Sequence, residues 1–244
     1  MTGNLEKRTI FITRSGSVLG TTYVRNMLAS GAQVVATDLP GARGEALKSE
    51  FANNDNFAYY DLDVGDEDQI KEIFKRVAAD GYAPNVVLNN AAITGELLMG
   101  TGKSFPDFAN TSLEDWEKTI KINLTGAFLI ARQMDIDIVG KYPAALINVA
   151  SMYALNGPHH DIYKDMPFKS FSAYSTTKAG IHGLTLWLAG YWAALGSTVN
   201  LSIILISSCR HPLTCIFRYS AGLCTSTGLH TTYTRRDVTT HSRH

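Results

Sequence analysis

Short apolar runs alternate with longer amphipathic stretches along the first 200 residues of the chain. The runs are rich in Val, Ile and Phe and predict buried strands, at residues 9–13, 33–37, 57–61, 85–88 and 144–149. The stretches between them predict helices, the first ending near Ser30 and the others at 41–53, 66–79, 111–134 and 172–195. Such alternation indicates parallel strands joined by helical crossovers, so we expect an α/β fold with a doubly wound parallel sheet in a single domain.

Composition narrows the classes of function. The 22 basic and 22 acidic residues give a formal net charge of +0, which favours neither nucleic acid nor an anionic membrane as a partner. No apolar run approaches the roughly 20 residues that span a bilayer, and the polar start, Met1 to Arg8, does not resemble a signal peptide. Three cysteines do not make a disulfide framework, so we expect a cytoplasmic protein.

The composition changes abruptly near residue 200. All three cysteines and four of the seven histidines follow Asn200, where Asp237 is the only acidic residue. We therefore expect a domain at 1–200 and an atypical tail at 201–244, and we hypothesise that the tail is read in a shifted frame. Its candidate zinc ligands lack paired C-x-x-C spacing, so no metal site is predicted among Cys209, His211, Cys215 and Cys224.

The turn after the first strand reads Thr-Arg-Ser-Gly-Ser-Val-Leu-Gly, residues 13–20. Glycines in such a turn let the backbone approach a pyrophosphate, and the following helix offers free N–H groups. Arg14 and Val18 stand where Thr-Gly-x-x-x-Gly-x-Gly needs glycine, and Arg14 and Ser17 where Thr-Gly-x-x-Gly-x-x-Gly does. The alternative is an ordinary β-α turn. The predicted cofactor contacts here are Arg14, Ser15, Gly16, Leu19 and Gly20.

Asp38 ends the second predicted strand, 18 residues after Gly20, where a carboxylate can bind the hydroxyls of the adenosine ribose. A carboxylate there repels a 2′-phosphate and favours NAD, whereas the guanidinium of Arg14 could bind that phosphate. We expect NAD, with NADP as the alternative. A merely solvated carboxylate is the other interpretation of Asp38.

Two further loops follow predicted strands and would meet the cofactor. Asp63 can contact the adenine amino group while the backbone of Val64 contacts the ring, although Asp in such a loop usually caps a helix. Asn89-Asn90-Ala91-Ala92 follows the fourth strand, and its small residues allow close backbone packing. The predicted contacts in these loops are Asp63, Val64, Asn90 and Ala91.

Tyr174 and Lys178 are the strongest candidates for chemistry. Positions i and i+4 share one face of a helix, so the ammonium lies beside the phenol and lowers its pKa. Such a phenol can exchange a proton with an alcohol or a carbonyl while hydride moves. Ser151 ends the fifth strand and could hold the substrate oxygen. Asn123 lies within a helix and could bind water or a backbone group at a kink, and each of these residues could instead be an ordinary surface group.

Taken in order, these motifs resemble the short-chain dehydrogenase/reductase family over about residues 9–200. The resemblance implies a Rossmann-type sheet, NAD(P)(H) as cofactor, and hydride transfer at a secondary alcohol or ketone. It implies that Tyr174 is the acid/base and that Lys178 also holds the nicotinamide ribose. It further implies that Ser151 polarises the substrate oxygen, that Asn123 anchors a relay water, and that the chain forms a homodimer or homotetramer.

The chain departs from the family pattern in its glycine turn, in a longer loop and in its tail. The loop Met152 to Pro167 resembles that of members linked to flagellin-glycan or polysaccharide sugar metabolism, so we expect a small polyol, sugar or sugar derivative as substrate. The alternative is a surface loop with no role in substrate binding. The tail lacks the family's Pro-Gly turn, so the last strand and the substrate-covering segment are expected to be missing or disordered. A dinucleotide-binding module with impaired catalysis is the alternative function.

Overall fold

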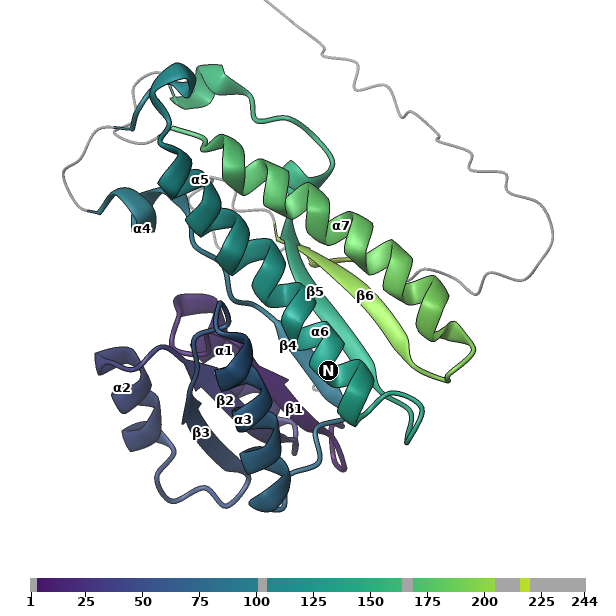
Figure 1. The fold of residues 1–244 in the computed structure, drawn as a ribbon. Helices are drawn as coiled ribbons and strands as arrows, with labels where there is room; N and C mark the ends of the chain where they lie inside the picture. The colour runs from purple at the N-terminus through teal and green to yellow at the C-terminus, as the bar shows by residue number, and fades with distance from the viewer. Residues whose placement is uncertain (1–3, 101–104, 164–168, 205–215, 220–244) are drawn as a thin grey trace, which may run out of the picture.

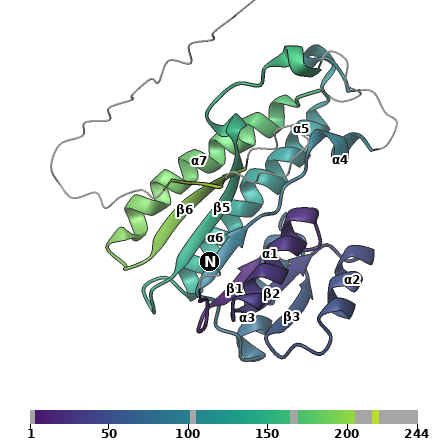
Figure 2. The ribbon, with the colours of Figure 1, turned by 180° about the vertical axis from the view of Figure 1, so that it is seen from behind.

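The computed structural model describes residues 4–100, 105–163, 169–204 and 216–219, which form a seven-stranded sheet with helices on both faces (Figures 1 and 2). Its strands are β1 (Thr9–Ile12), β2 (Gln33–Asp38), β3 (Phe57–Asp61), β4 (Val86–Asn89), β5 (Ala145–Ser151), β6 (Thr198–Ile204) and β7 (Ile216–Tyr219). Its α-helices are α1 (Val18–Ala29), α2 (Ala42–Glu50), α3 (Glu67–Ala79), α4 (Gly95–Met99), α5 (Leu113–Ile120), α6 (Gly126–Asp137) and α7 (Ser172–Ala193).

The strand order is β3-β2-β1-β4-β5-β6-β7, and the strands from β1 to β6 are all parallel to their neighbours. The order reverses between β1 and β4, which is the Rossmann arrangement and confirms the predicted fold. Ligands of such sheets bind at the carboxyl ends of the strands beside this reversal. The turn after β1, Asp38 of β2, Asn89 of β4 and Ser151 of β5 all lie at that edge.

The C-terminal region differs in one respect from the expectation that the last strand is missing. A short strand, β7, pairs antiparallel with β6, with Leu201 opposite Tyr219 and Ile204 opposite Ile216. β6 itself continues past residue 200 to Ile204. The predicted substrate-covering segment and the cysteines and histidines of the tail lie outside the described residues.

Both faces of the sheet are buried, which explains the continuous apolar runs of the sequence. Ile10 and Ile12 of β1 pack in a cluster with residues of α1 and α2, whereas Phe11 packs in a cluster with residues of α3, α6 and α7. The side chains of Phe11 and Ile12 are fully buried. Each such side chain stabilises the fold by roughly 1.5–3 kcal/mol relative to an exposed one.

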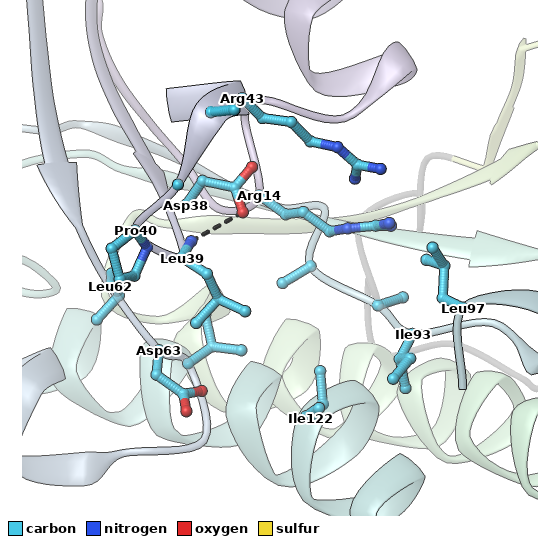
Figure 3. A pocket seen from close by; sticks show the side chains of 15 residues that line it. Arg14, Asp38, Leu39, Pro40, Arg43, Leu62, Asp63, Ile93, Leu97 and Ile122 are labelled. Atoms are coloured by element: carbon cyan, nitrogen blue, oxygen red, sulfur yellow. Dashed lines mark hydrogen bonds between the residues drawn. The ribbon is translucent and has the colours of Figure 1, made fainter. Parts of the chain in front are cut away.

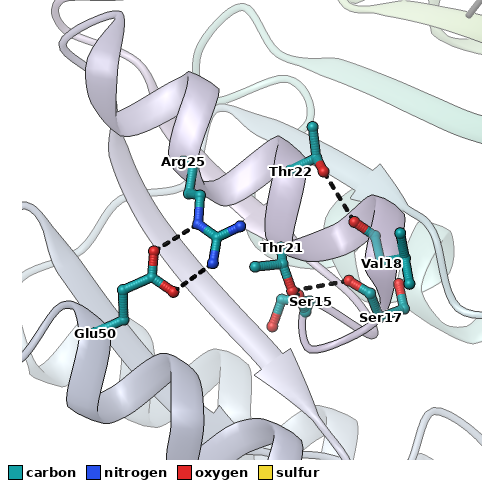
Figure 4. A network of polar contacts seen from close by, with 7 residues as sticks. All are labelled: Ser15, Ser17, Val18, Thr21, Thr22, Arg25 and Glu50. Carbon is teal, nitrogen blue, oxygen red and sulfur yellow. Dashed lines mark hydrogen bonds and ion pairs between the residues drawn. The ribbon is translucent and has the colours of Figure 1, made fainter. Parts of the chain in front are cut away.

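Polar contacts hold α1 in place beside the turn that precedes it (Figure 4). Ser17 caps the helix, and its hydroxyl oxygen accepts a hydrogen bond of 3.0 Å from the backbone N–H of Gly20. Farther along α1, Arg25 forms a bidentate ion pair with Glu50 at the end of α2. The start of α1 is therefore fixed relative to β1 and α2.

The long helix predicted at 111–134 begins later and is interrupted. Thr111 ends a 3-10 turn, and the N-cap is Ser112, whose hydroxyl oxygen accepts the backbone N–H of Asp115. The helix therefore begins after Ser112 and not at Thr111. A π-helical segment, Lys121–Thr125, separates α5 from α6 and contains Asn123.

Candidate active site

A cavity of about 480 Å³ opens at the carboxyl edge of the sheet (Figure 3). This volume is within the range of sites for small molecules and cofactors. Five of the residues predicted to contact a cofactor line it: Arg14, Asp38, Asp63, Val64 and Ala91. The other lining residues are not among the contacts predicted from the sequence: Leu39, Pro40, Gly41, Ala42, Arg43, Leu62, Ala92, Ile93, Leu97 and Ile122.

Most of these additional residues share a signal that could have revealed them. Leu39 follows Asp38 directly, Leu62 precedes Asp63 directly, and the others lie in the loops and helices close to the predicted contacts. The strand ends that carry polar groups also carry apolar side chains, which form the walls of the cavity. Sequence motifs emphasise the polar groups, but a planar base needs apolar walls as well.

Asp38 lies at the end of β2 with its carboxylate against the glycine turn. Its Oδ2 accepts a hydrogen bond of 2.8 Å from the N–H of Gly16, and its Oδ1 accepts one of 2.8 Å from the N–H of Leu39. A Cβ atom at Gly16 would lie 2.8 Å from Asp38 Oδ2, so glycine is needed for this approach. The carboxylate is thus aligned by the backbone at the edge of the cavity.

The glycine turn is tightly packed despite its incomplete pattern. A Cβ atom at Gly20 would lie 2.4 Å from the carbonyl oxygen of Arg14, so this position requires glycine. Ser15 is fully buried, and its hydroxyl donates to the carbonyl of Thr37 at 3.0 Å. Neither Ser15 nor Leu19 lines the cavity, so their predicted cofactor contacts have no side-chain counterpart there.

Asn90 fastens the glycine turn to the end of β4. Its side-chain nitrogen donates to the carbonyl oxygens of Thr13 and Arg14, at 3.2 and 3.1 Å. The hydroxyl oxygen of Thr13 in turn accepts the N–H groups of Asn90 and Ala91, at 3.0 and 2.9 Å. Asn90 therefore holds the glycine turn in position beside the cavity, but its own side chain does not line the cavity.

Asp63 and Val64, in the loop after β3, form another wall of the cavity. Asp63 Oδ1 accepts the N–H of Gly65 at 2.8 Å, which fixes the loop after β3. A Cβ atom at Gly126 would lie 2.9 Å from the carbonyl oxygen of Val64, so the start of α6 can approach this loop closely. Asp63 does not cap α3, because the N-cap of that helix is Asp66; Asp63 instead holds the loop before the helix and lines the cavity.

Tyr174 and Lys178 lie together near the start of α7. The ammonium nitrogen of Lys178 is 5.6 Å from the centre of the Tyr174 ring and donates a 2.8 Å hydrogen bond to the carbonyl of Val149 on β5. The Lys178 side chain is almost completely buried. Burial, together with the charge of Arg14, lowers the pKa of Lys178 from 10.5 to about 8.

Ser151, at the end of β5, and Asn123, in the π-helical segment before α6, are both buried. The hydroxyl oxygen of Ser151 accepts the N–H of Tyr153 at 3.3 Å, which leaves the hydroxyl hydrogen available for another acceptor. The Asn123 amide accepts the N–H of Ile93 at 2.7 Å and donates to its carbonyl at 3.0 Å. Asn123 thus binds a backbone group at a helix irregularity, and the interpretation as a solvent-facing residue is wrong.

A chain of buried hydrogen bonds connects the elements near the carboxyl edge of the sheet. Asn89 donates to Asn148 Oδ1 at 2.9 Å, and Asn148 donates to the hydroxyl of Thr185 at 2.9 Å. Thr185 donates in turn to the carbonyl of Ile181 at 2.7 Å. This chain links β4, β5 and α7, which carry or adjoin most of the candidate catalytic groups.

Within the described part of the chain, no group of three His, Cys, Asp or Glu side chains could hold a metal ion. His159 and His160, which are described, belong to no such cluster. The same residues contain no helix long and apolar enough to cross a membrane.

Comparison with known proteins identifies the family. The sequence model of the short chain dehydrogenase family matches residues 8–210, so the chain belongs to this family. It is 27% identical over 200 residues to the 3-oxoacyl-[acyl-carrier-protein] reductase FabG of Aquifex aeolicus, covering 80% of this chain and 72% of the relative. It is 29% identical over 204 residues to 3beta-hydroxysteroid dehydrogenase 1 of Eggerthella lenta, covering 82% and 70%.

The fold is also shared with solved structures. A short chain dehydrogenase from Mycobacterium smegmatis superimposes with a TM-score of 0.71 at 22% identity, covering 84% of this chain and 80% of the other. Membership of the family, together with the relatives named as reductases and dehydrogenases, makes the chain an NAD(P)-dependent oxidoreductase.

The apolar walls and the polar groups of the cavity suit a dinucleotide. Asp38 offers a carboxylate for ribose hydroxyls in the cavity wall. The start of α1, whose residues do not themselves line the cavity, offers helix N–H groups for phosphate beside it. Arg14 adds a cation inside the cavity. The residues present can therefore hold the cofactor of the family.

Proposed function

We propose that the chain transfers hydride between the nicotinamide cofactor and a secondary alcohol or ketone, with Tyr174 as the acid/base and Lys178 beside it. The observation that carries the proposal is the distance of 5.6 Å between the Lys178 ammonium and the Tyr174 ring, at the carboxyl edge of the sheet. The cofactor supplies or accepts the hydride. All proton handling is assigned to residues of the chain.

Tyr174 donates a proton to the carbonyl oxygen in reduction and takes it from the hydroxyl in oxidation. A protonated Lys178 stabilises the phenolate of Tyr174 by its positive charge, and also holds the nicotinamide ribose. Ser151 donates its hydroxyl hydrogen to the substrate oxygen, because its own lone pair already accepts from Tyr153. Asn123 holds the backbone at Ile93 and anchors the relay water.

We propose NAD as the preferred cofactor, with NADP as the alternative. Asp38 supports this preference because its carboxylate lies at the cavity wall, where it would repel a 2′-phosphate. Arg43, exposed and five residues further along, is the residue that most favours the alternative.

A small polyol, sugar or sugar derivative is the proposed substrate. The two relatives are named for a 3-oxoacyl group and for a 3beta-hydroxysteroid, so one name contains a ketone, the other a hydroxyl, and they do not share one substrate. Support for a hydroxylated substrate comes from the loop after Ser151. The hydroxyls of Tyr153 and Tyr163 are hydrogen-bonded to each other there.

We also propose a homodimer or homotetramer that pairs through α7 and α5–α6. The exposed face of α7 is apolar or small at spacings of three and four residues, over Gly183, Leu186, Trp187, Gly190 and Tyr191. Phe128 and Ile136 of α6 are exposed as well. Such a stripe with no charged side chain is suited to burial against a second copy.

The cytoplasm is the proposed compartment, and the frame-shift hypothesis for the tail is kept as a proposal. Its support is the composition beyond Asn200. Translation of the coding DNA in the other two frames tests it. If neither frame shows a Pro-Gly turn followed by a strand pattern, the hypothesis is rejected.

The function is tested by titrating NADH and NADPH with nicotinamide fluorescence and by screening polyols and sugars for reduction of NAD. Turnover that is abolished in Tyr174→Phe, with NADH binding retained, supports the enzyme. Tyr142→Phe is a matched control at a tyrosine whose hydroxyl contacts Pro84. Binding without turnover, unaffected by Tyr174→Phe, would instead support the impaired binding module.

A further inference from the structure

Arg14 has a backbone conformation that residues other than glycine rarely adopt. Its φ angle is 54°, in the left-handed region. This conformation costs a residue other than glycine roughly 1–2 kcal/mol, because its Cβ atom approaches the following carbonyl oxygen. The conformation is imposed by the turn, because the Arg14 carbonyl accepts hydrogen bonds from the Ser17 hydroxyl and the Asn90 amide, at 3.0 and 3.1 Å. A glycine would fit here without this cost.

The side chain of Arg14 extends into the cavity (Figure 3). Half-buried there, its guanidinium makes no hydrogen bond or ion pair with the described residues, and burial lowers its pKa. The neighbouring carboxylate, Asp38, instead accepts backbone N–H groups from Gly16 and Leu39. A partly desolvated cation without a hydrogen-bonded anion is suited to an anionic ligand.

The surroundings of Arg14 indicate which part of a ligand it would meet. Arg14 follows β1, which lies between β2 and β4 in the sheet, and it lines the cavity together with Asp38 at the end of β2 and Ala91 after β4. Lys178 is hydrogen-bonded to β5, on the other side of β4. Arg14 therefore lies between the end where the adenosine ribose would bind and the reactive pair. In a dinucleotide, the pyrophosphate joins these two ends and carries negative charge.

We propose that Arg14 is a side-chain ligand of the pyrophosphate bridge of the dinucleotide, in a turn where backbone N–H groups otherwise do this work. The inference rests on the proposed function, since it presumes a dinucleotide in this cavity. The guanidinium compensates for the missing glycines at positions 14 and 18 by adding charge-assisted hydrogen bonds to the phosphates. Retention of a strained arginine at this position is thereby explained.

The test is a binding panel read by calorimetry or by nicotinamide fluorescence, with adenosine, ADP-ribose, NADH and NADPH as ligands. Arg14→Gln removes the charge, Arg14→Lys keeps it, and Arg43→Gln is the matched control in the same cavity. We expect Arg14→Gln to weaken ADP-ribose and NADH about tenfold and equally, while leaving adenosine unchanged, and Arg14→Lys to recover part of the loss. Salt should weaken ADP-ribose binding more in the wild type than in Arg14→Gln.

Several results would overturn the inference. A loss confined to NADPH would assign Arg14 to the 2′-phosphate, and an equal loss in Arg43→Gln would indicate a general effect of charge. Arg14→Gly is free of backbone strain and should show the same loss as Arg14→Gln, so tighter NADH binding in it would mean that the arginine obstructs the cavity. If the wild type binds neither NADH nor ADP-ribose, the proposed function itself fails.

Discussion

Replacement of Lys178 by methionine is expected to stabilise the protein while abolishing turnover. The folded state lowers the pKa of this amine from 10.5 to about 8. At about 1.36 kcal/mol per pK unit, keeping the ammonium charged inside the fold costs about 3 kcal/mol at pH 7. Loss of the hydrogen bond to the Val149 carbonyl offsets about 1 kcal/mol of this, so Lys178→Met should gain about 2 kcal/mol in the free energy of unfolding.

The pH dependence of this gain is the sharper measurement. Between pH 8 and 10.5 the unfolded chain keeps a proton on Lys178 that the folded protein has released, so the wild type becomes more stable as pH rises. From pH 7 to pH 9 the wild type should gain about 1.3 kcal/mol relative to Lys178→Met. Urea unfolding of the cofactor-free protein at both pH values measures the difference.

Lys118→Met, at an exposed position of α5, is the matched control and should show no such pH-dependent difference. The reasoning is refuted if the stability difference between wild type and Lys178→Met is the same at pH 7 and pH 9. It is equally refuted if Lys178→Met is the less stable protein at pH 7.

Three further changes test the packing around the site and the proposed assembly. Gly20→Ala should lower stability by about 1–3 kcal/mol in urea unfolding and weaken NADH binding, because the new methyl group would lie 2.4 Å from the Arg14 carbonyl; unchanged values would contradict this. Thr185→Val should cost about 1–3 kcal/mol by removing the acceptor of the Asn148 amide, whereas Thr185→Ser should not. Trp187→Glu should convert the oligomer to monomers in light scattering, and an unchanged mass would exclude α7 from the interface.

Most of the fold could be predicted because β1 to β5 and the longer helices have strong local signals, whereas α4, β6 and β7 were not among the predicted elements. The strand at residues 57–61 and the helix at 172–195 agree with β3 and α7 to within two residues. The interruption of the long helix at Lys121–Thr125 could not be predicted. It accompanies a contact between Asn123 and Ile93, 30 positions apart, and no local pattern records such a pairing.

The candidate site could also be predicted in part from the sequence. Motif spacing identified Asp38 and Arg14 as neighbours of the cavity, because both follow strands whose ends meet at one edge of the sheet. It did not identify Arg43 or Leu97, whose places depend on how α2 and α4 fold back over that edge. Nor could it show that the ammonium of Lys178 is bound to a carbonyl of β5.

That bond between Lys178 and the carbonyl of Val149 joins two reactive groups to one strand end. Ser151 follows Val149 by two positions on β5, so a shift of this strand carries the serine hydroxyl and the lysine ammonium in the same direction. Thermal displacement of the edge would then translate the reacting groups as one body and largely preserve their spacing. Mutations in the interior that tilt β5 should accordingly be tolerated better than mutations that bend it between these two residues.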